Sequence, residues 1–417
     1  MRVFKFGGAS VKDADGIRNL HGIIAREVPD KLIMVVSAMG KTTNALEEVL
    51  HLRSKGRNFT EKLDSILHFH LSVVDELFER IPQELTVAIE TQKKEVQRHL
   101  NEKAYDEYAL YDTVVSLGEL LSTLIIEAYL SQQGIHSLWM DARQLIETDN
   151  KHREGAVQWK QTEEKCKRID EALKVHQCIV TQGFIAASNE GHTTTLGREG
   201  SDYSAAILAH VLQAEQLTIW KDVAGVFNAD PKYFDDVVKL DYVSFEEAIE
   251  LAYYGASIIH PRTIQPLQDK DIELCVKSFK NPNDTGTRIG SKKVKRVDYP
   301  LYIVQTGQYL ITIATRDYAF IVEDHLKHIF SVFARHQVKI DIMQNSAIHF
   351  SVAVHNANGR LGALLEELSK SYEVKTNQNL ELLTIRHYNN FIMDKLLAGK
   401  QILMEQRTRQ TYRALYI

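Results

Sequence analysis

The first ten residues constrain the fold more than any other part of the chain. Met1–Ser10 is a short apolar strand containing one lysine, followed at once by two glycines and a serine. Glycine lets the backbone approach a ligand closely, and consecutive N–H groups ahead of a helix form an anion-binding concavity. Such a turn is also typical of a plain strand-to-helix connection. Four downstream segments of similar chemistry favour the phosphate site.

The order of apolar segments predicts an α/β fold. Residues 1–45 have the pattern strand, glycine turn, helix, strand, and the unbroken apolar run 32–36 is typical of a strand buried on both faces. Further strands are expected at 179–181, 217–220 and 272–276. Strands that alternate with helices indicate an open, mainly parallel sheet flanked by helices, which we assign to residues 1–295.

Two helical features are expected within residues 1–295. Residues 46–130 carry apolar side chains at helical spacing and are expected to form a helical insertion. Ser244 and Glu247 have the spacing of a capping box, which predicts that a helix begins there.

The character of the chain changes near residue 295, after a loop rich in Asn, Pro and Gly. Residues 296–379 have the order βαββαβ, which predicts a small α+β module. Its expected strands are 310–315, 338–344, 349–354 and 373–376, and its expected helices are 323–336 and 361–371. Residues 380–417 are expected to add a strand at 380–387, a helix at 390–406 and a strand at 412–417, as a partial second module.

Length and composition exclude several classes of protein. A chain of 417 residues exceeds one ordinary core, so two or three domains are expected. The net charge of −5 gives no basic footprint for nucleic acid. The three cysteines are scattered without metal-site spacing. With no apolar stretch of membrane-spanning length and no secretory signal expected, we predict a cytoplasmic protein.

The second candidate segment, Ser37–Asn44, follows the second strand. Its Gly-Lys-Thr is not a Walker A motif, because that motif needs glycine at position 35, where this chain has Val35. A polar loop remains at the carboxyl end of a strand, where open α/β sheets bind ligands. Ser37 and Thr43 either hold a polar substrate there or cap the next helix.

The third and fourth segments carry charged residues. Glu119 opens a strongly apolar helix without a cation at helical spacing, so it lies at the surface or has a function. In Gly197–Ser204, the planar fork of Arg198 fits a carboxylate. Asp202 suits a helix cap and also suits a charged site.

The fifth segment, 220–232, begins at the end of a strand and carries two lysines, two aspartates and, beyond Trp220, the aromatic side chain of Phe227. Phe227 could stack on a planar base and Lys232 could meet phosphates. A simple Asp-Pro turn with exposed lysines would explain the same residues.

Together the five segments resemble the amino-acid kinase superfamily and, within it, the aspartate kinases. The similarity lies in Lys5–Val11, Ser37–Asn44, Gly118-Glu119, Gly197–Tyr203 and the Gly255-Ala256 and His260-Pro261 pairs. It extends over nearly the whole chain, because aspartate kinases also end in βαββαβ regulatory modules of the ACT type. A monofunctional member without a homoserine dehydrogenase part is expected.

The resemblance implies transfer of the γ-phosphoryl group of ATP to the side-chain carboxylate of L-aspartate, the first step of lysine, threonine and methionine biosynthesis. Lys5 and Asp202 would be catalytic. The implied aspartate contacts are Ser37, Thr43, Glu119, Arg198 and Ser201. The implied phosphate and nucleotide contacts are Gly7, Gly8, Ser10, Lys221, Asp222, Phe227, Lys232, Ser257 and Ile258. Mg²⁺ is expected to bridge the phosphates without direct protein ligands.

Three positions in the nucleotide segments depart from the family pattern. Ser257 stands where many members carry a lysine, Lys221 where many carry threonine, and Phe227 where tyrosine is common. Our hypothesis is that Lys221 supplies the missing cation from the other side of the nucleotide.

Regulation and assembly are expected from the C-terminal region. Asp341, Gln344, Asn345 and Ser346 stand where an amino-acid effector, lysine or threonine, could bind; a purely structural dimerisation sheet is the alternative. Exposed strand edges favour a homodimer or larger assembly. Two other functions stay open: another kinase of this fold, acting on acetylglutamate, glutamate or uridylate, and an inactive amino-acid sensor.

Overall fold

The computed structural model describes residues 1–417 except 28–29, 103–105, 257–258, 293–298, 318 and 357–358. The chain forms two compact units. The first comprises Met1–Val226, Lys239–Ile249 and Ile258–Lys293; the second comprises Phe227–Val238, Glu250–Ser257 and Val294–Ile417. The domain limits inferred from the sequence stay a prediction.

The first unit contains an eight-stranded sheet in the order β3-β5-β2-β1-β8-β10-β11-β9. The strands from β3 to β10 in this order are parallel, whereas β11 runs antiparallel to β10. This confirms the predicted open, mainly parallel α/β sheet. The strand bounds are β1 Arg2–Phe6, β2 Leu32–Val36, β3 Ser137–Trp139, β5 Cys178–Gln182, β8 Gln216–Lys221, β9 Tyr242–Ser244, β10 Glu273–Ser278 and β11 Thr287–Gly290.

Alternation along β1 sends neighbouring side chains to opposite faces of this sheet. Phe6 stacks on Trp220, with ring centroids 6.1 Å apart, and Phe4 meets the same indole edge-on. Lys5, between the two phenylalanines, therefore extends to the other face. There its register partners are Val35 and Ile219.

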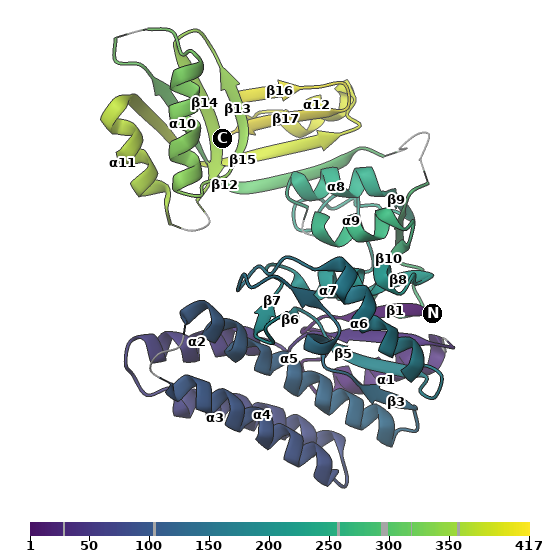
Figure 1. Cartoon of the computed structure of the whole chain (residues 1–417). Helices are drawn as coiled ribbons and strands as arrows, with labels where there is room; N and C mark the ends of the chain where they lie inside the picture. Colours follow the sequence, from purple (N-terminus) through teal and green to yellow (C-terminus); the bar gives the residue numbers. More distant parts are fainter. Residues whose placement is uncertain (28–29, 103–105, 257–258, 293–298, 318, 357–358) are drawn as a thin grey trace. The chain divides into compact units, whose positions relative to one another are not determined.

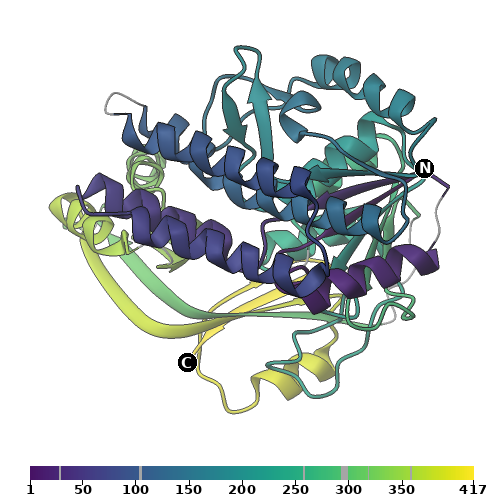
Figure 2. The same ribbon diagram turned by 90° about the horizontal axis from the view of Figure 1, so that it is seen from below.

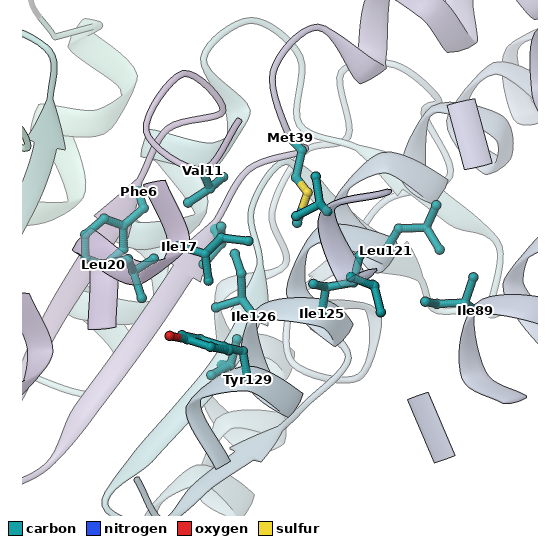
Figure 3. Packing of buried hydrophobic residues seen from close by; sticks show 14 of the residues in the cluster. Phe6, Val11, Ile17, Leu20, Met39, Ile89, Leu121, Ile125, Ile126 and Tyr129 are labelled. Atoms are coloured by element: carbon teal, nitrogen blue, oxygen red, sulfur yellow. The ribbon is translucent and has the colours of Figure 1, made fainter. Parts of the chain in front are cut away.

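Helices cover both faces of the sheet. The aromatic face carries a large apolar core to which α1 to α5 contribute, and Figure 3 shows Phe6, Ile17, Leu121 and Ile125 within it. Helices α2 to α5 gather on one side of this unit (Figures 1 and 2), which confirms the predicted helical insertion. Their bounds are α1 Ala14–Glu27, α2 Thr42–Ser54, α3 Thr60–Leu77, α4 Gln83–Asn101 and α5 Glu107–Gln132.

Helix α5 corrects one expectation. It is long and apolar enough to cross a membrane by length and composition, although no stretch of that kind was expected. In the structure, 83% of its most apolar window is buried. The run is apolar because α5 packs among α2, α3, α4 and the sheet.

The remaining elements of this unit include a three-stranded sheet in the order β4-β6-β7. The capping box at Ser244 forms as predicted on its serine side, where the hydroxyl accepts a hydrogen bond from the N–H of Glu247 at 3.1 Å. The bounds are η1 Ala142–Gln144, β4 Glu147–Thr148, α6 Trp159–Ala172, β6 Ile185–Ser188, β7 Thr193–Thr195, α7 Gly200–Val211, α8 Phe245–Tyr253, which continues into the second unit, and α9 Pro261–Asp269.

The second unit is built on an antiparallel six-stranded sheet in the order β13-β14-β12-β15-β17-β16 (Figure 1). The order from β12 to β15 along the chain is βαββαβ, which confirms that prediction. The bounds are β12 Leu301–Ala314, α10 Glu323–Arg335, β13 Ile340–Asn345, β14 His349–His355, α11 Leu361–Ser371, β15 Glu373–Arg386, α12 Asn390–Leu397, β16 Ile402–Arg407 and β17 Thr411–Tyr416.

Four predicted elements of this unit are wrong in their limits. The strand expected at 310–315 is only the end of β12, which begins at Leu301. The strands expected at 373–376 and 380–387 are one strand, β15, which passes a register irregularity opposite Gln305–Leu310 of β12. Asn379 adopts φ 57° there, in the left-handed region, and a residue of this type suggests a turn when only the sequence is known. The helix expected at 390–406 ends at Leu397, before Gly399 at φ 75°, and β16 follows.

The same irregularity explains the short C-terminal segment. The first half of β12, Leu301–Gln305, pairs with the second half of β15, whose other side pairs with β17. The last 38 residues therefore do not build a separate sheet but extend that of the first module.

Candidate active site

A pocket of about 400 Å³ lies in the first unit, at the carboxyl ends of β1, β2 and β8 and the start of α7. This volume is in the range of small-molecule sites. The lining residues are Lys5, Gly8, Ser37, Ala38, Gly40, Thr43, Glu119, Phe184, Gly197, Glu199, Gly200, Ser201, Asp202 and Lys221. The pocket thus draws on all five segments singled out in the sequence.

The glycine turn after β1 lies tightly against the turn after β2. A Cβ added to Gly8 would come within 2.4 Å of the Ala38 carbonyl oxygen, so no side chain fits there. The N–H of Gly40 donates to the carbonyl of Gly8 at 2.9 Å. A Cβ on Gly7 would lie 3.5 Å from Lys5 Nζ. Bare backbone at both glycines therefore leaves room for an anion beside Lys5.

Two lysines converge on one buried carboxylate. Lys5 Nζ lies 2.6 Å from Asp202 Oδ1, and Lys221 Nζ lies 3.6 Å from Oδ2. Asp202, in the first turn of α7, is only 3% exposed. Burial alone would raise the pKa of Asp202, but the charges of Lys5 and Lys221 hold it below its usual value. The carboxylate is ionised and fixes the position of Lys5.

Glu119 is a buried carboxyl group of the opposite kind. It lies on α5, is 3% exposed, and its Oε1 accepts one long hydrogen bond, 3.4 Å, from the N–H of Ala38. Its Oε2 is buried and has no hydrogen-bond partner among the described residues. Burial raises the pKa of Glu119 to about 8, against the smaller effect of the Ala38 hydrogen bond. The surface position left open by the sequence is wrong; the geometry suits a ligand that brings a cation or a donor.

The turn between β7 and α7 is conformationally constrained. Gly197 has φ 76° and Glu199 has φ 54°, an uncommon state for a residue with a side chain. A Cβ on Gly200 would come within 2.7 Å of the ring of Phe184. Arg198, between the two left-handed residues, is exposed and does not line the pocket. The structure therefore does not bring the predicted carboxylate clamp into the site.

Other predicted site residues lie outside the lining. Ser10 is buried, and its N–H donates to the carbonyl of Gly7 at 2.9 Å. Asp222 is exposed, directly after β8. Phe227 and Lys232 belong to the 227–238 segment of the second unit. Ser257 and Ile258 lie outside the described residues.

The candidate effector residues lie on or directly after β13, the edge strand of the six-stranded sheet. Gln344, Asn345 and Ser346 are exposed. Asp341 is more enclosed: its Oδ2 accepts from Gln308 Nε2 at 3.2 Å, and its carbonyl accepts from Arg413 at 2.5 Å.

Two lining residues were missed in the sequence. Phe184 follows Gly183 directly after β5, so its place at a strand's carboxyl end was a usable signal. A Cβ on Gly183 would lie 2.5 Å from Ser201 Cβ, which explains the glycine. Glu199 lies within the segment Gly197–Ser204 but was not among the predicted site residues. Its side chain lines the pocket, and its Oε2 is buried without a hydrogen-bond partner among the described residues.

Comparisons with known proteins agree with this geometry. The model of the amino acid kinase family matches residues 1–278. Lysine-sensitive aspartokinase 3 of Escherichia coli is 30% identical over 396 residues, which cover 92% of this chain and 86% of that protein. The bifunctional aspartokinase/homoserine dehydrogenase of Daucus carota is 33% identical over 300 residues, 70% of this chain and 32% of that one.

Among solved structures, E. coli aspartokinase III in complex with lysine and aspartate has a TM-score of 0.86 at 28% identity, covering 100% of this chain and 95% of that one. The same enzyme in complex with aspartate and ADP has a TM-score of 0.80 at 27% identity, covering 100% and 96%. The aspartate kinase of Clostridium acetobutylicum has a TM-score of 0.81 at 22% identity, covering 100% and 96%, which is a likeness of fold.

Proposed function

The chain belongs to the amino acid kinase family and, within it, to the aspartokinases, and we propose that its pocket transfers the γ-phosphoryl group of ATP to the side-chain carboxylate of L-aspartate. The family assignment confirms the resemblance found in the sequence. The observation that carries the proposal is one pocket lined by Lys5, bare glycine backbone and the buried carboxyl group of Glu119.

The phosphate side supplies positioning and positive charge. Phosphoryl transfer needs these more than covalent participation by the protein. Lys5 stabilises the negative charge on the phosphoryl group in flight, while the turn at Gly7 and Gly8 receives the phosphates, next to Ser10. Asp202 keeps the Lys5 ammonium in place and is already ionised, so its role is electrostatic.

The opposite side binds aspartate. Glu119 receives the α-ammonium group, and the hydroxyls of Ser37, Thr43 and Ser201 donate to the substrate carboxylates. The planar guanidinium of Arg198 clamps one carboxylate by turning inward from its exposed position. The complexes of E. coli aspartokinase III with aspartate support aspartate as the substrate class.

The nucleotide is proposed to be ATP, held by Asp222, Phe227, Lys232, Ser257 and Ile258, with Lys221 contacting its phosphates. The complex of the E. coli enzyme with ADP supports the nucleotide class.

Mg²⁺ fits this site as a companion of the phosphates. The described residues contain no group of three or more His, Cys, Asp or Glu that could hold a metal, and Asp202 is engaged by two lysines. Mg²⁺ commonly keeps waters and binds through substrate phosphates. When bound, it would neutralise part of the phosphate charge, and the protein's own contribution is the cation pair Lys5 and Lys221.

Regulation and assembly are part of the proposal. We infer that lysine or threonine acts as an effector near Asp341, Gln344, Asn345 and Ser346, and that the cytoplasmic enzyme is a homodimer or larger. The name of the lysine-sensitive E. coli relative supports an amino-acid effector. The edge strand β13, with three exposed positions in sequence, supports strand-edge pairing.

An ADP-release assay on the full chain tests the proposed reaction. Purified protein with ATP and Mg²⁺ is given aspartate, glutamate, acetylglutamate or uridylate separately, and lysine or threonine is added in further runs. We expect ADP release to depend on aspartate alone. Release driven by another acceptor would redirect the assignment, and no release with any acceptor would support the inactive sensor. The comparisons give no support to either alternative.

A further inference from the structure

A second buried carboxylate on α5 lies outside the pocket and takes no part in the proposed chemistry. Asp112 is completely buried, seven residues before Glu119 on the same helix. Seven residues are two helical turns, so the two side chains share one face about 10 Å apart along the axis. Burial raises the pKa of Asp112, against the hydrogen bonds that it accepts. An acid at such a position needs partners, and removing them is costly.

Both oxygens of Asp112 accept hydrogen bonds from segments distant in sequence. Thr195 donates its hydroxyl to Oδ1 at 2.7 Å. The N–H of Arg153 donates to Oδ2 at 2.9 Å, and the ring Nδ1 of His152 lies 3.0 Å from the same oxygen. The carboxylate thus joins α5 to the end of β7 and to the loop at 152–153.

These partners lead directly to the turn that begins α7. Thr195 ends β7 two residues before Gly197. The carbonyl oxygen of Arg153 would lie 3.3 Å from a Cβ on Gly197, and the N–H of Gly155 donates to the carbonyl of Thr195 at 2.9 Å. The loop held by Asp112 therefore lies against the backbone of the turn.

Arg153 is itself held in an uncommon conformation. Its φ is 67°, and its guanidinium carbon lies 4.1 Å from the ring centroid of Tyr111, the neighbour of Asp112 on α5. A backbone in the left-handed region persists only where its surroundings determine it. Here the surroundings are the carboxylate of Asp112 and the ring beside it.

We propose that Asp112 is a positioning residue for the aspartate side of the pocket: it fixes the turn Gly197–Ser201 relative to Glu119 by binding Thr195 and the 152–153 loop to α5. The turn carries Arg198 and Ser201, whereas Lys5 and Gly8 lie on β1 and the turn after it. Loosening the turn displaces Arg198 and Ser201. The glycine turn at Gly8 is held separately, by its packing against Ala38 and its hydrogen bond from Gly40. The inference rests on the proposed function for its kinetic readout only.

The test uses the full chain with Asp112→Asn and Thr195→Val, two changes that weaken the same connection from opposite ends. We expect each to raise the KM for aspartate about tenfold, because small displacements of positioning groups are costly, and to leave the KM for ATP within about twofold of wild type. Asp106→Ala is the matched control. Asp106 caps the same helix by accepting from the N–H groups of Tyr108 and Ala109, so its loss lowers the melting temperature without reaching the turn.

Hydrogen exchange supplies a readout that is independent of the reaction. Asp112→Asn should speed exchange of amides in 195–203 and leave exchange in 32–40 unchanged. Asp106→Ala should change exchange in neither segment. If both KM values rise together, or if exchange quickens everywhere, Asp112 only stabilises the fold and the proposal is overturned. If wild type releases no ADP with aspartate while the local exchange effect appears, the proposed function fails and the positioning role stands. Should Asp112→Asn not fold, Thr195→Val decides alone.

Discussion

The pocket contains two deeply buried carboxyl groups in opposite electrostatic states. Asp202 has Lys5 at 2.6 Å and Lys221 at 3.6 Å, and its pKa is lowered. Glu119 is equally buried, has one long hydrogen bond, and its pKa is raised to about 8. Carboxyl groups whose surroundings drive their pKa values apart commonly have different roles. The charge of Asp202 is already neutralised by two lysines of the protein, whereas Glu119 has no cationic partner in the described part of the chain until a ligand supplies one.

Removing Lys5, the cation nearest to Asp202, should have the largest effect on activity. Lys5→Met leaves the phosphates without their closest ammonium, and loss of one preorganised charge typically lowers kcat by about 10²–10³-fold. Steady-state ADP release at saturating aspartate and ATP measures it. Lys12→Met, an exposed lysine on the following turn, should keep wild-type kcat. Near-normal turnover in Lys5→Met would remove Lys5 from the reaction.

The ionisation of Glu119 should control the pH dependence of aspartate binding. Glu119 binds an ammonium only when ionised, so below its pKa of about 8 the KM for aspartate should rise as pH falls. The expected slope approaches tenfold per pH unit, or about 50-fold between pH 8 and pH 6. Glu119→Gln should raise the KM and flatten the profile.

Glu127 supplies a matched control for this profile. It lies on the same helix, accepts from the Ser137 hydroxyl at 2.9 Å, and has a pKa raised by burial, but it does not line the pocket. Glu127→Gln should therefore preserve the slope. A wild-type KM that is flat from pH 6 to 8 would contradict the assignment of Glu119 as the ammonium partner.

The two sides of the pocket were not equally predictable from the sequence. The turn at Gly7-Gly8 could be predicted because close approach of the backbone requires glycine there. The strand-turn-helix order also places Lys5 at the carboxyl end of a strand. Burial of Glu119 was undecided, since the sequence does not show that α5 is covered on nearly every side. Arg198 shows the opposite limit. Its chemistry could be recognised in the sequence, but its exposed position outside the pocket lining, between two residues with positive φ, could not.

In the second unit, the order of elements was predictable and their continuity was not. Apolar alternation revealed each half of β15, but Asn379 in a left-handed conformation looks like a turn residue in sequence. Pairing with β12 carries the strand through that point. The short strand β16 was not predicted, although Gly399 marks the end of the helix before it; its pairing with β17 identifies it as a strand.

A smaller effect is expected from Lys221, the second lysine beside Asp202. Lys221→Met should raise the KM for ATP about tenfold, the size of one charge-assisted contact, and leave the KM for aspartate nearly unchanged. Lys277→Met is the matched control, because Lys277 is a partly buried lysine on the adjacent strand that pairs with Glu27 at 2.7 Å and does not line the pocket. Equal changes in both KM values would contradict a nucleotide-directed role for Lys221.

The smallest expected effect concerns the third carboxyl group of the pocket, Glu199. A left-handed residue with a side chain costs about 1–2 kcal/mol, and glycine returns about 0.4–1 kcal/mol of that through the freer unfolded chain. Glu199→Gly should therefore raise the free energy of unfolding by about 0.5 kcal/mol, measured by urea denaturation. Gln213→Gly, at φ 48° and outside the pocket lining, should give a similar gain. A loss of stability in Glu199→Gly alone would mean that its carboxylate supports the turn.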